Sequence, residues 1–166
     1  MGLSDVMFIL QMALVTILFC AINIFSLRKG PRGFIQHYPA DVQTHAVLLG
    51  EVTRGYIITK EKAGRAGAWA LYSVAVVLII AVLNGFTGFF PLYIQALIFM
   101  EWLNLFDGVI IEGIILHHVP KLMIPGTEEM LKASGHRVYL RRRVIVALLS
   151  IPYSAVLAGI AMLIQG

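Results

Sequence analysis

Residues 101–120 combine an apolar stretch with groups that can do acid–base or metal chemistry. Three carboxylates and two adjacent histidines occur there: Glu101, Asp107, Glu112, His117 and His118. Such groups can relay protons, act as general acids and bases, or bind a divalent metal. An ionised side chain facing lipid costs several kcal/mol. If this stretch crosses a membrane, we therefore expect its polar groups to face a protein interior or a wet cavity.

On an ideal helix, at about 100° per residue, most of these polar groups share one arc. Glu101, Gly108 and Glu112 lie within about 40° of one another. Asn104 falls about 60° to one side of Glu101, and Asp107 falls about 120° to that same side. We expect Glu101, Asp107 and Asn104 to form an ion or proton path. The alternative is that the acids pair with arginines of the loops and only fix helix packing.

The histidines gather in or beside two basic segments of the chain. They are His37, His45, His117, His118 and His136. We expect His117 and His118 to bind a divalent metal, zinc or iron, because imidazole is a common ligand of both. Adjacent rings point about 100° apart on a helix, so a bend would be needed for both to reach one ion. In the alternative interpretation, both histidines hydrogen-bond carbonyl groups at a helix end.

Asp41 and His45 are four residues apart and would lie on one helix face. A carboxylate so placed could orient an imidazole that acts as a general base. With Glu112 they form our candidate catalytic set, and an ordinary surface pair is the alternative. Pro39 is expected at the start of this helix and Gly50 at its end.

The composition predicts a membrane protein, because 59% of the 166 residues are hydrophobic and only 13% are charged. Soluble domains contain about 45–50% apolar and about 25% charged residues. A membrane-spanning helix needs about 20 apolar residues. Four stretches qualify, at about residues 7–27, 66–86, 89–116 and 144–164. We expect a single all-α domain, residues 1–166, forming a bundle of four transmembrane helices.

The basic residues predict the orientation of this bundle. All 13 Lys and Arg fall within segments 28–65 and 117–143. The positive-inside rule places both loops in the cytoplasm and both termini outside. We expect a bacterial cytoplasmic membrane, with anionic lipid attracted to the basic loops. Nucleic acid is excluded as a partner, because no readout motif accompanies the charge.

The second basic loop and the fourth apolar stretch predict two further structural features. Thr127 is typical of a helix N-cap, and Gly135 is expected to close a short helix before the fourth span. Small residues recur along that span, namely Ala147, Ser150, Ser154, Ala158 and Ala161. They permit close helix contact inside the bundle or in a homo-oligomer.

Three functions remain open from the sequence. The first is a membrane protein with a catalytic or metal-binding polar site at the cytoplasmic mouth of the third span, acting on an amphipathic or membrane-embedded substrate. The second is an oligomeric proton- or ion-coupled transporter that uses Glu101 and Asp107. The third is a non-catalytic assembly subunit of a membrane complex. The sequence leaves open whether the chain is an enzyme, and it identifies no substrate, reaction or oligomeric number.

Overall fold

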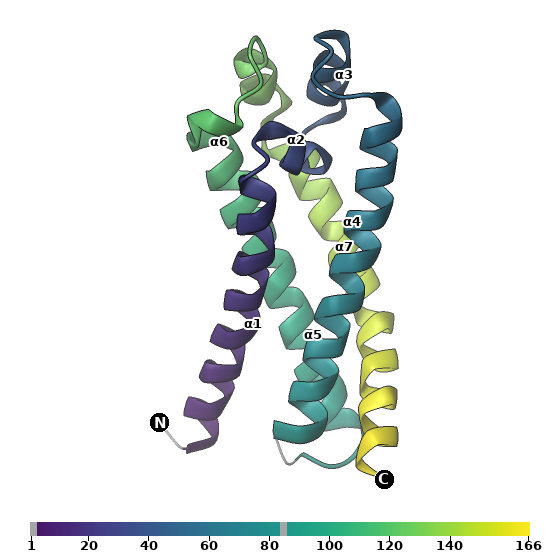
Figure 1. Ribbon diagram of the computed structural model, residues 1–166. Coiled ribbons are helices and arrows are strands. Elements are labelled where there is room, and N and C mark those ends of the chain that lie inside the picture. Colours follow the sequence, from purple (N-terminus) through teal and green to yellow (C-terminus); the bar gives the residue numbers. More distant parts are fainter. Residues whose placement is uncertain (1–2, 84–85) are drawn as a thin grey trace. The chain divides into compact units, whose positions relative to one another are not determined.

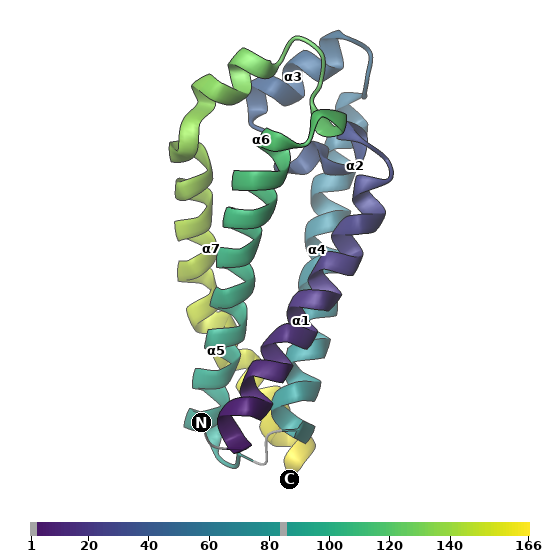
Figure 2. The ribbon, with the colours of Figure 1, turned by 90° about the vertical axis from the view of Figure 1, so that its left-hand side faces the viewer.

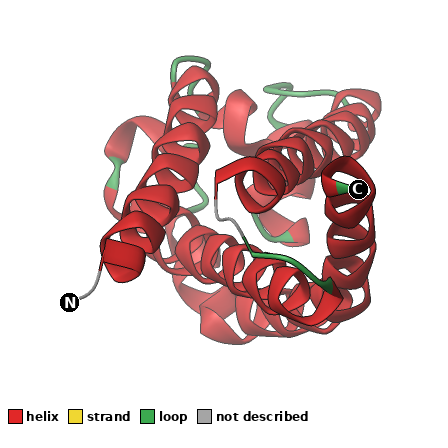
Figure 3. Ribbon diagram, turned by 90° about the horizontal axis from the view of Figure 1, so that it is seen from below, coloured by secondary structure: helices red, strands yellow, loops and turns green. Residues whose placement is uncertain are grey.

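The computed structural model describes residues 3–83 and 86–166, without the side chains of residues 3–5, 65 and 134–138. In these ranges every element is a helix, and loops and turns join them with no strand (Figure 3). The all-α fold class expected from the sequence is therefore confirmed. The side chain of His136 lies outside the described residues.

Four helical segments are long and apolar enough to cross a membrane (Figure 1). They are Val6–Leu27, Arg54–Leu83, Phe89–His118 and Tyr139–Gln165. Each overlaps one of the apolar stretches predicted from the sequence. Helix α4 (Arg54–Leu78) nevertheless begins before residue 66, where the second stretch was expected to start. Apolar composition marks the part of a helix that suits lipid, whereas charged residues also favour helix and extend it further.

The predicted end of a helix at Gly135 is wrong. Helix α7 runs without interruption from Glu128 to Gln165 and passes through both Gly135 and Pro152. Glycine in a helix interior is less favourable than alanine by roughly 1 kcal/mol, but it ends a helix only when its backbone turns left-handed. Thr127 precedes α7 as expected, but its hydroxyl donates to the carbonyl oxygen of Ile124 at 2.8 Å.

The chain divides into two compact units, which we describe separately. The termini unit comprises Met1–Ala21, Trp69–Asn104 and Ile145–Gly166. The loop unit comprises Ile22–Ala68 and Leu105–Val144. Both basic segments expected to form loops thus contribute to one unit, and the two chain ends belong to the other.

The termini unit is built from α1 (Leu3–Leu27), the end of α4, η2 (Ile79–Leu83), α5 (Phe89–Phe106) and the end of α7. Aromatic pairs connect these helices. The rings of Phe8 and Phe99 are 5.6 Å apart, and the ring of Trp69 meets the ring of Tyr153 edge-on at 4.9 Å. Of the five regularly spaced small residues predicted to allow close helix contact, four are buried, namely Ser150, Ser154, Ala158 and Ala161. Their burial fits close helix contact within the unit.

Large apolar side chains cover the outside of the termini unit. Ile17 is 65% exposed, Phe90 69% and Leu163 84%. Soluble monomers rarely expose extended apolar surface, whereas lipid-facing helices do so along their length. This exposed apolar surface is the kind expected of helices that are long and apolar enough to cross a membrane.

The loop unit contains the short elements of both basic segments. In chain order these are α2 (Pro31–Phe34), η1 (Ile35–His37), α3 (Ala40–Leu48), η3 (Asp107–Ile115), α6 (Leu116–His118) and η4 (Pro120–Leu122). Helix α2 lies against η4, so the first loop contacts the second (Figure 2). Pro39 stands directly before α3, and Gly50 follows it with a left-handed backbone (φ +73°). The predicted helix of the first loop is thereby confirmed.

A buried tyrosine joins the two loops. The hydroxyl of Tyr38 donates a hydrogen bond to the carbonyl oxygen of Leu122. Tyr38 and Leu122 are both buried, together with Phe34, Ile35 and Ile124. Burial, and to a smaller extent the nearby Tyr139, raises the pKa of Tyr38 well above its usual range. The hydroxyl therefore stays protonated and remains a donor at any physiological pH.

We predict that Gly33→Ala destabilises the protein by about 2 kcal/mol or more. A Cβ at residue 33 would overlap the backbone carbonyl of Ser26, where α2 folds back onto the end of α1. Backbone cannot move aside as the end of a flexible side chain can. Chemical unfolding of purified protein in detergent would measure the change. Gly64→Ala is the matched control, because nothing lies within 4 Å of its Cβ position and alanine favours the helix. Equal stability of the two variants would contradict the prediction.

Candidate functional site

The centre of the candidate site is Glu112, whose side chain is 0% exposed. Glu112 lies in η3, a π-helical segment that continues α5. Such segments are rare and often occur at functional sites. The loop unit also places His37 of η1 and two arginines of α7, Arg142 and Arg143, beside this carboxylate.

Two arginines neutralise Glu112. Arg143 donates from Nε to Oε2 at 2.9 Å, and its Nη2 lies 2.6 Å from Oε1. Arg142 donates from Nη1 to Oε1 at 3.1 Å. A guanidinium that engages both carboxylate oxygens in this way forms one of the strongest side-chain pairs. Burial of a charge is tolerable only when such partners satisfy it.

The π-helical geometry adds Asp107 to the same pair. Asp107 Oδ2 lies 2.5 Å from Arg143 Nη2, the atom that also faces Glu112. On an α-helix, residues five apart point about 140° away from each other. A π-helix forms its hydrogen bonds between residues five apart and so brings them to one side. We call Glu112, Asp107, Arg142, Arg143 and His37 the charge cluster; its two acids and two arginines balance in formal charge.

A glycine makes room for the arginine. A Cβ at Gly108 would lie 3.1 Å from Cδ and 3.2 Å from Nε of Arg143. The guanidinium therefore reaches both acids across the bare backbone of residue 108. Arg142 also donates to the backbone carbonyl of Gln36 at 3.3 Å, which ties the cluster to the first loop.

His37 is the ionisable group of the cluster with the fewest partners. Its Nδ1 lies 3.7 Å from Glu112 Oε1, and its ring packs on Phe34 at 5.4 Å. Within the part of the chain whose side chains are described, several buried atoms of this region have no hydrogen-bond partner, among them His37 Nδ1, Gln36 Oε1, Asp107 Oδ1 and the Tyr139 hydroxyl. Buried polar atoms are almost always satisfied by protein, water or a ligand. These atoms are available to bind a polar group.

His37, Asp107 and Glu112 could also hold a metal, because one ligand atom of each lies within 4.8 Å of the others. In the described part of the chain this is the single such group. Arg143 already stands between the two acids and supplies the positive charge that a metal would supply. The geometry therefore fits a charge-paired polar site better than a metal centre.

The histidines predicted as metal ligands have backbone partners. His117 Nδ1 is 2.9 Å from the carbonyl oxygen of Glu112, and His118 Nδ1 is 3.0 Å from that of Ile114. The ring of His117 also meets Tyr139 at 5.9 Å. These contacts match the alternative in which both histidines hydrogen-bond helix carbonyls. Metal binding by the pair stays a prediction. A metal would have to bind the second ring nitrogen of each histidine, because Nδ1 faces a carbonyl oxygen.

The other predicted site residues are dispersed. Asp41 is exposed and accepts the backbone N–H of Val42 at 2.9 Å. His45 faces the second loop, with Nε2 3.4 Å from the Cβ position of Gly126. Among the described residues, no ion pair or hydrogen bond joins Asp41 or His45 to Glu112. Their catalytic role stays a prediction.

The predicted ion path belongs partly to the termini unit. There Glu101 accepts a hydrogen bond from the hydroxyl of Ser150. Asn104 is half-buried in the same unit and has a partner of its own. Asp107 belongs to the loop unit, where Arg143 pairs with it.

Sequence reasoning grouped His37 with the other histidines but did not place it beside Glu112, and it left Arg142 and Arg143 out of the candidate set. The run of arginines at 141–143, directly before the fourth apolar stretch, was the available signal. Under the predicted topology, this run of arginines lies on the same side of the membrane as Glu112. The sequence could therefore indicate a partner for Glu112, but not which arginine supplies it.

Fold and site together define a class of protein. It is all-helical, it has four helices long and apolar enough to cross a membrane, and its loop unit encloses a buried cluster of paired charges. Comparisons with protein-family models, curated proteins and solved structures found no match. The assignment of function therefore depends on the geometry of the site.

We predict that Arg143→Met destabilises the protein by about 3–5 kcal/mol, because it removes the cation that pairs with Asp107 and leaves the buried Glu112 with Arg142 as its remaining arginine. The vacated space would also let His37, Asp107 and Glu112 bind zinc, so added zinc should recover part of the stability of the variant. Chemical unfolding with and without zinc would measure both effects. Arg141→Met is the matched control, because Arg141 is exposed. An equal effect of zinc on wild type and Arg143→Met would contradict the prediction.

Proposed function

We propose that this chain is an integral membrane protein with four transmembrane helices, both termini outside and the loops 28–65 and 117–143 in the cytoplasm. Two observations support this arrangement. The helices that could cross a membrane expose large apolar side chains, and all Lys and Arg lie in the two loop segments. The loop unit, with the charge cluster, would then lie at the cytoplasmic side of the bilayer.

We further propose that the charge cluster is the polar site of a protein that acts on an amphipathic or membrane-embedded substrate. One observation carries this proposal: a fully buried Glu112 on a π-helical segment is surrounded by ionisable groups, and several buried atoms beside them make no hydrogen bond to the described residues. Ionisable residues inside membrane proteins commonly mark functional sites.

The residues of the cluster would have different roles. Glu112 is engaged by both arginines and is a poor proton acceptor, so its role would be to position Arg142 and Arg143. His37 Nδ1 lies 3.7 Å from a carboxylate oxygen, longer than a hydrogen bond, and is the better candidate for a general base. Asp107 Oδ1 and Gln36 Oε1 would accept hydrogen bonds from the polar end of the substrate.

We predict that His37→Ala strongly lowers the activity and leaves a folded protein. The protein, reconstituted in nanodiscs, would be incubated with a total lipid extract while mass spectrometry follows which lipid is consumed or retained. Loss of a general base lowers a rate by about 10²–10⁴-fold. Unfolding measurements should show a protein that still folds with some loss of stability, because the variant loses the ring packing on Phe34 and the contact with Glu112 while both arginines still neutralise that carboxylate.

His118→Ala is the matched control for this experiment, since His118 is exposed and bonds a helix carbonyl away from the cluster. Full activity of His37→Ala would overturn the role of His37. A wild-type protein that neither consumes nor retains any lipid would overturn the proposed function.

The termini unit favours a second candidate, a proton- or ion-coupled transporter. Its interior contains Gln11, Gln95 and Ser154, which are 3%, 5% and 0% exposed. Among the described residues, no hydrogen-bond partner is found for either polar atom of the Gln11 amide, for Gln95 Oε1 or for Ser154 Oγ. Buried polar groups in membrane helices are expensive and often line ion paths. Glu101, bonded to Ser150, would be the coupling carboxylate of this path.

If the chain is such a transporter, Glu101→Gln should abolish flux, because the amide cannot take up and release a proton. Proteoliposomes with a pH-sensitive dye and defined sodium or potassium gradients would measure flux. Asp107→Asn is the informative comparison, since Arg143 already neutralises Asp107. Flux through Glu101→Gln at the wild-type rate would exclude Glu101 as the coupling residue.

A further inference from the structure

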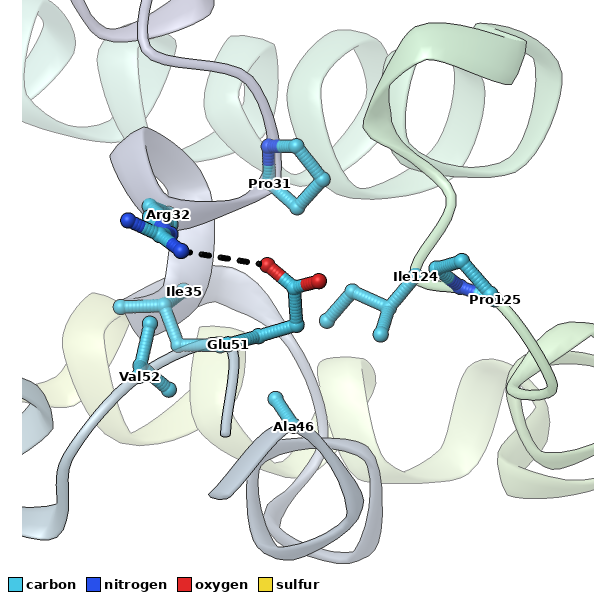
Figure 4. Close-up of a pocket in the computed structure, with 8 residues that line it drawn as sticks. All are labelled: Pro31, Arg32, Ile35, Ala46, Glu51, Val52, Ile124 and Pro125. Atoms are coloured by element: carbon cyan, nitrogen blue, oxygen red, sulfur yellow. Dashed lines mark hydrogen bonds and ion pairs between the residues drawn. The ribbon is translucent and has the colours of Figure 1, made fainter. Parts of the chain in front are cut away.

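The termini unit contains a carboxyl group, that of Glu101, which no basic side chain of the same unit can neutralise. The three segments of this unit contain no Lys, Arg or His. The loop unit differs, because arginines pair with the acids of its charge cluster. Even at its surface, beside a small apolar pocket, Glu51 pairs with Arg32 (Figure 4). Glu101 therefore has to be stabilised in another way.

The arginines that follow Glu101 and precede Ser150 in the sequence are not free to help. Arg142 and Arg143 are the two closest to Ser150, and both are engaged by acids of the charge cluster. The other ionisable side chains of the termini unit are Asp5, Cys20 and the tyrosines at 72, 93 and 153. None of these groups carries positive charge in either of its protonation states.

Glu101 also lies far inside the helix that would cross the membrane. Phe89, the first residue of α5, and Glu101 are twelve positions apart, which is about 18 Å along the helix axis. The hydrocarbon core of a bilayer is about 30 Å thick, so the proposed arrangement puts Glu101 near its middle. An ionised carboxylate at this depth without a cation costs several kcal/mol. A protonated carboxyl group is neutral and needs only hydrogen bonds.

The partner of Glu101 favours the protonated form as well. Ser150 is 1% exposed, and its hydroxyl oxygen lies within hydrogen-bond distance of Glu101 and, at 2.8 Å, of the carbonyl oxygen of Ala147. A hydroxyl group has one hydrogen to donate. If Glu101 is ionised, it competes with Ala147 for that hydrogen. If Glu101 is protonated, it donates to Ser150 while Ser150 donates to Ala147, and both contacts are satisfied.

We infer that Glu101 is a proton-binding site and that it holds its proton while it lies against Ser150. The hydrogen bond between the two side chains then runs in the opposite direction to the one that an ionised Glu101 allows. A proton at Glu101 also names the ion that the transporter candidate would couple, and this assignment rests on the proposed membrane location.

A proton suits this position better than a metal cation does. Hard cations such as Ca²⁺ take about 6–8 oxygen ligands. A proton needs one carboxyl oxygen and one acceptor, and the hydroxyl of Ser150 is such an acceptor. In the described part of the chain, the group of side chains that could hold a metal does not include Glu101.

A membrane-soluble carbodiimide would test the inference, because it reacts with protonated carboxyl groups in apolar surroundings. The carboxyl proton moves to one nitrogen of the carbodiimide, and the carboxyl oxygen bonds to the central carbon as one C=N double bond becomes single. The full chain in phosphatidylcholine nanodiscs would be treated with dicyclohexylcarbodiimide, and tandem mass spectrometry would locate the modified residue.

We expect Glu101 to be labelled about tenfold or more above Glu112, because two arginines favour the charged form of Glu112. Sodium or potassium chloride at constant pH should leave the labelling of Glu101 unchanged. Absence of label at Glu101, or equal labelling of Glu112, would overturn the inference. Protection of Glu101 by either salt would also overturn it, because a metal cation would then occupy the carboxyl group.

Infrared spectroscopy would detect the proton without a reagent. The wild type should show the carbonyl band of a protonated carboxyl group, and Glu101→Gln should lack it. Glu101→Gln should fold, because the amide resembles the protonated carboxyl group in size and charge. A carboxylate band in place of the carbonyl band would contradict the inference. The carbodiimide experiment uses the wild type and does not depend on the folding of this variant.

Ser150→Ala should shift the carbonyl band, because Glu101 loses its hydrogen-bond partner. Ser154→Ala is the matched control, since Ser154 is also buried in α7 and no hydrogen-bond partner is found for its hydroxyl among the described residues. Equal bands in the two variants would exclude Ser150 as the partner of the proton.

These measurements separate the proton site from the proposed functions, because none of them uses flux or lipid turnover. A labelled Glu101 in a protein without flux would overturn the transporter candidate and support the proton site. An unlabelled Glu101 in protein that has inserted into nanodiscs would overturn the proton site alone. Failure of the protein to insert would overturn the proposed membrane location and, with it, the inference.

Discussion

The loop unit is organised around one constraint, the charge of Glu112, which has no exposed surface. A buried carboxylate is destabilising by several kcal/mol unless opposite charge and hydrogen bonds compensate it. Arg142 and Arg143 provide this compensation. Other features follow from it. Gly108 leaves space for the arginine, the π-helical segment turns Asp107 toward it, and Arg142 joins the cluster to the backbone of Gln36.

The same constraint decides which groups are free for chemistry. Glu112 is the most buried acid of the molecule's described part, yet both of its oxygens are already engaged by guanidinium groups. A group held in this way orders its neighbours and is poorly suited to accept a proton. Reactivity is better assigned to the partly satisfied groups at the edge of the cluster, His37 and Asp107. If burial were the only criterion, Glu112 would have been chosen as the reactive group.

The two units contain different kinds of buried polar residues. In the loop unit, acids and arginines pair and cancel in charge. In the described part of the termini unit, the buried polar side chains are neutral amides and hydroxyls, and the acid Glu101 is bonded to a serine hydroxyl. Paired charges favour a fixed site, whereas neutral groups without partners favour exchange with water or a moving ion. The two candidate functions therefore belong to different parts of the chain.

The amino-acid sequence by itself determined the helical class, the four apolar segments, the separation of basic loops from chain ends without Lys or Arg and the helix between Pro39 and Gly50. These features depend on composition, periodicity and local turn preferences, and all three are set by residues that are close together in the sequence. Only the tertiary structure decided which arginines neutralise Glu112, that His37 joins them, and that His117 and His118 bond backbone carbonyls. It also placed Asp107 beside Glu112, because ideal α-helix geometry cannot anticipate a π-helical segment. Periodicity records which face of a helix is polar, but the partner on that face comes from a distant part of the chain.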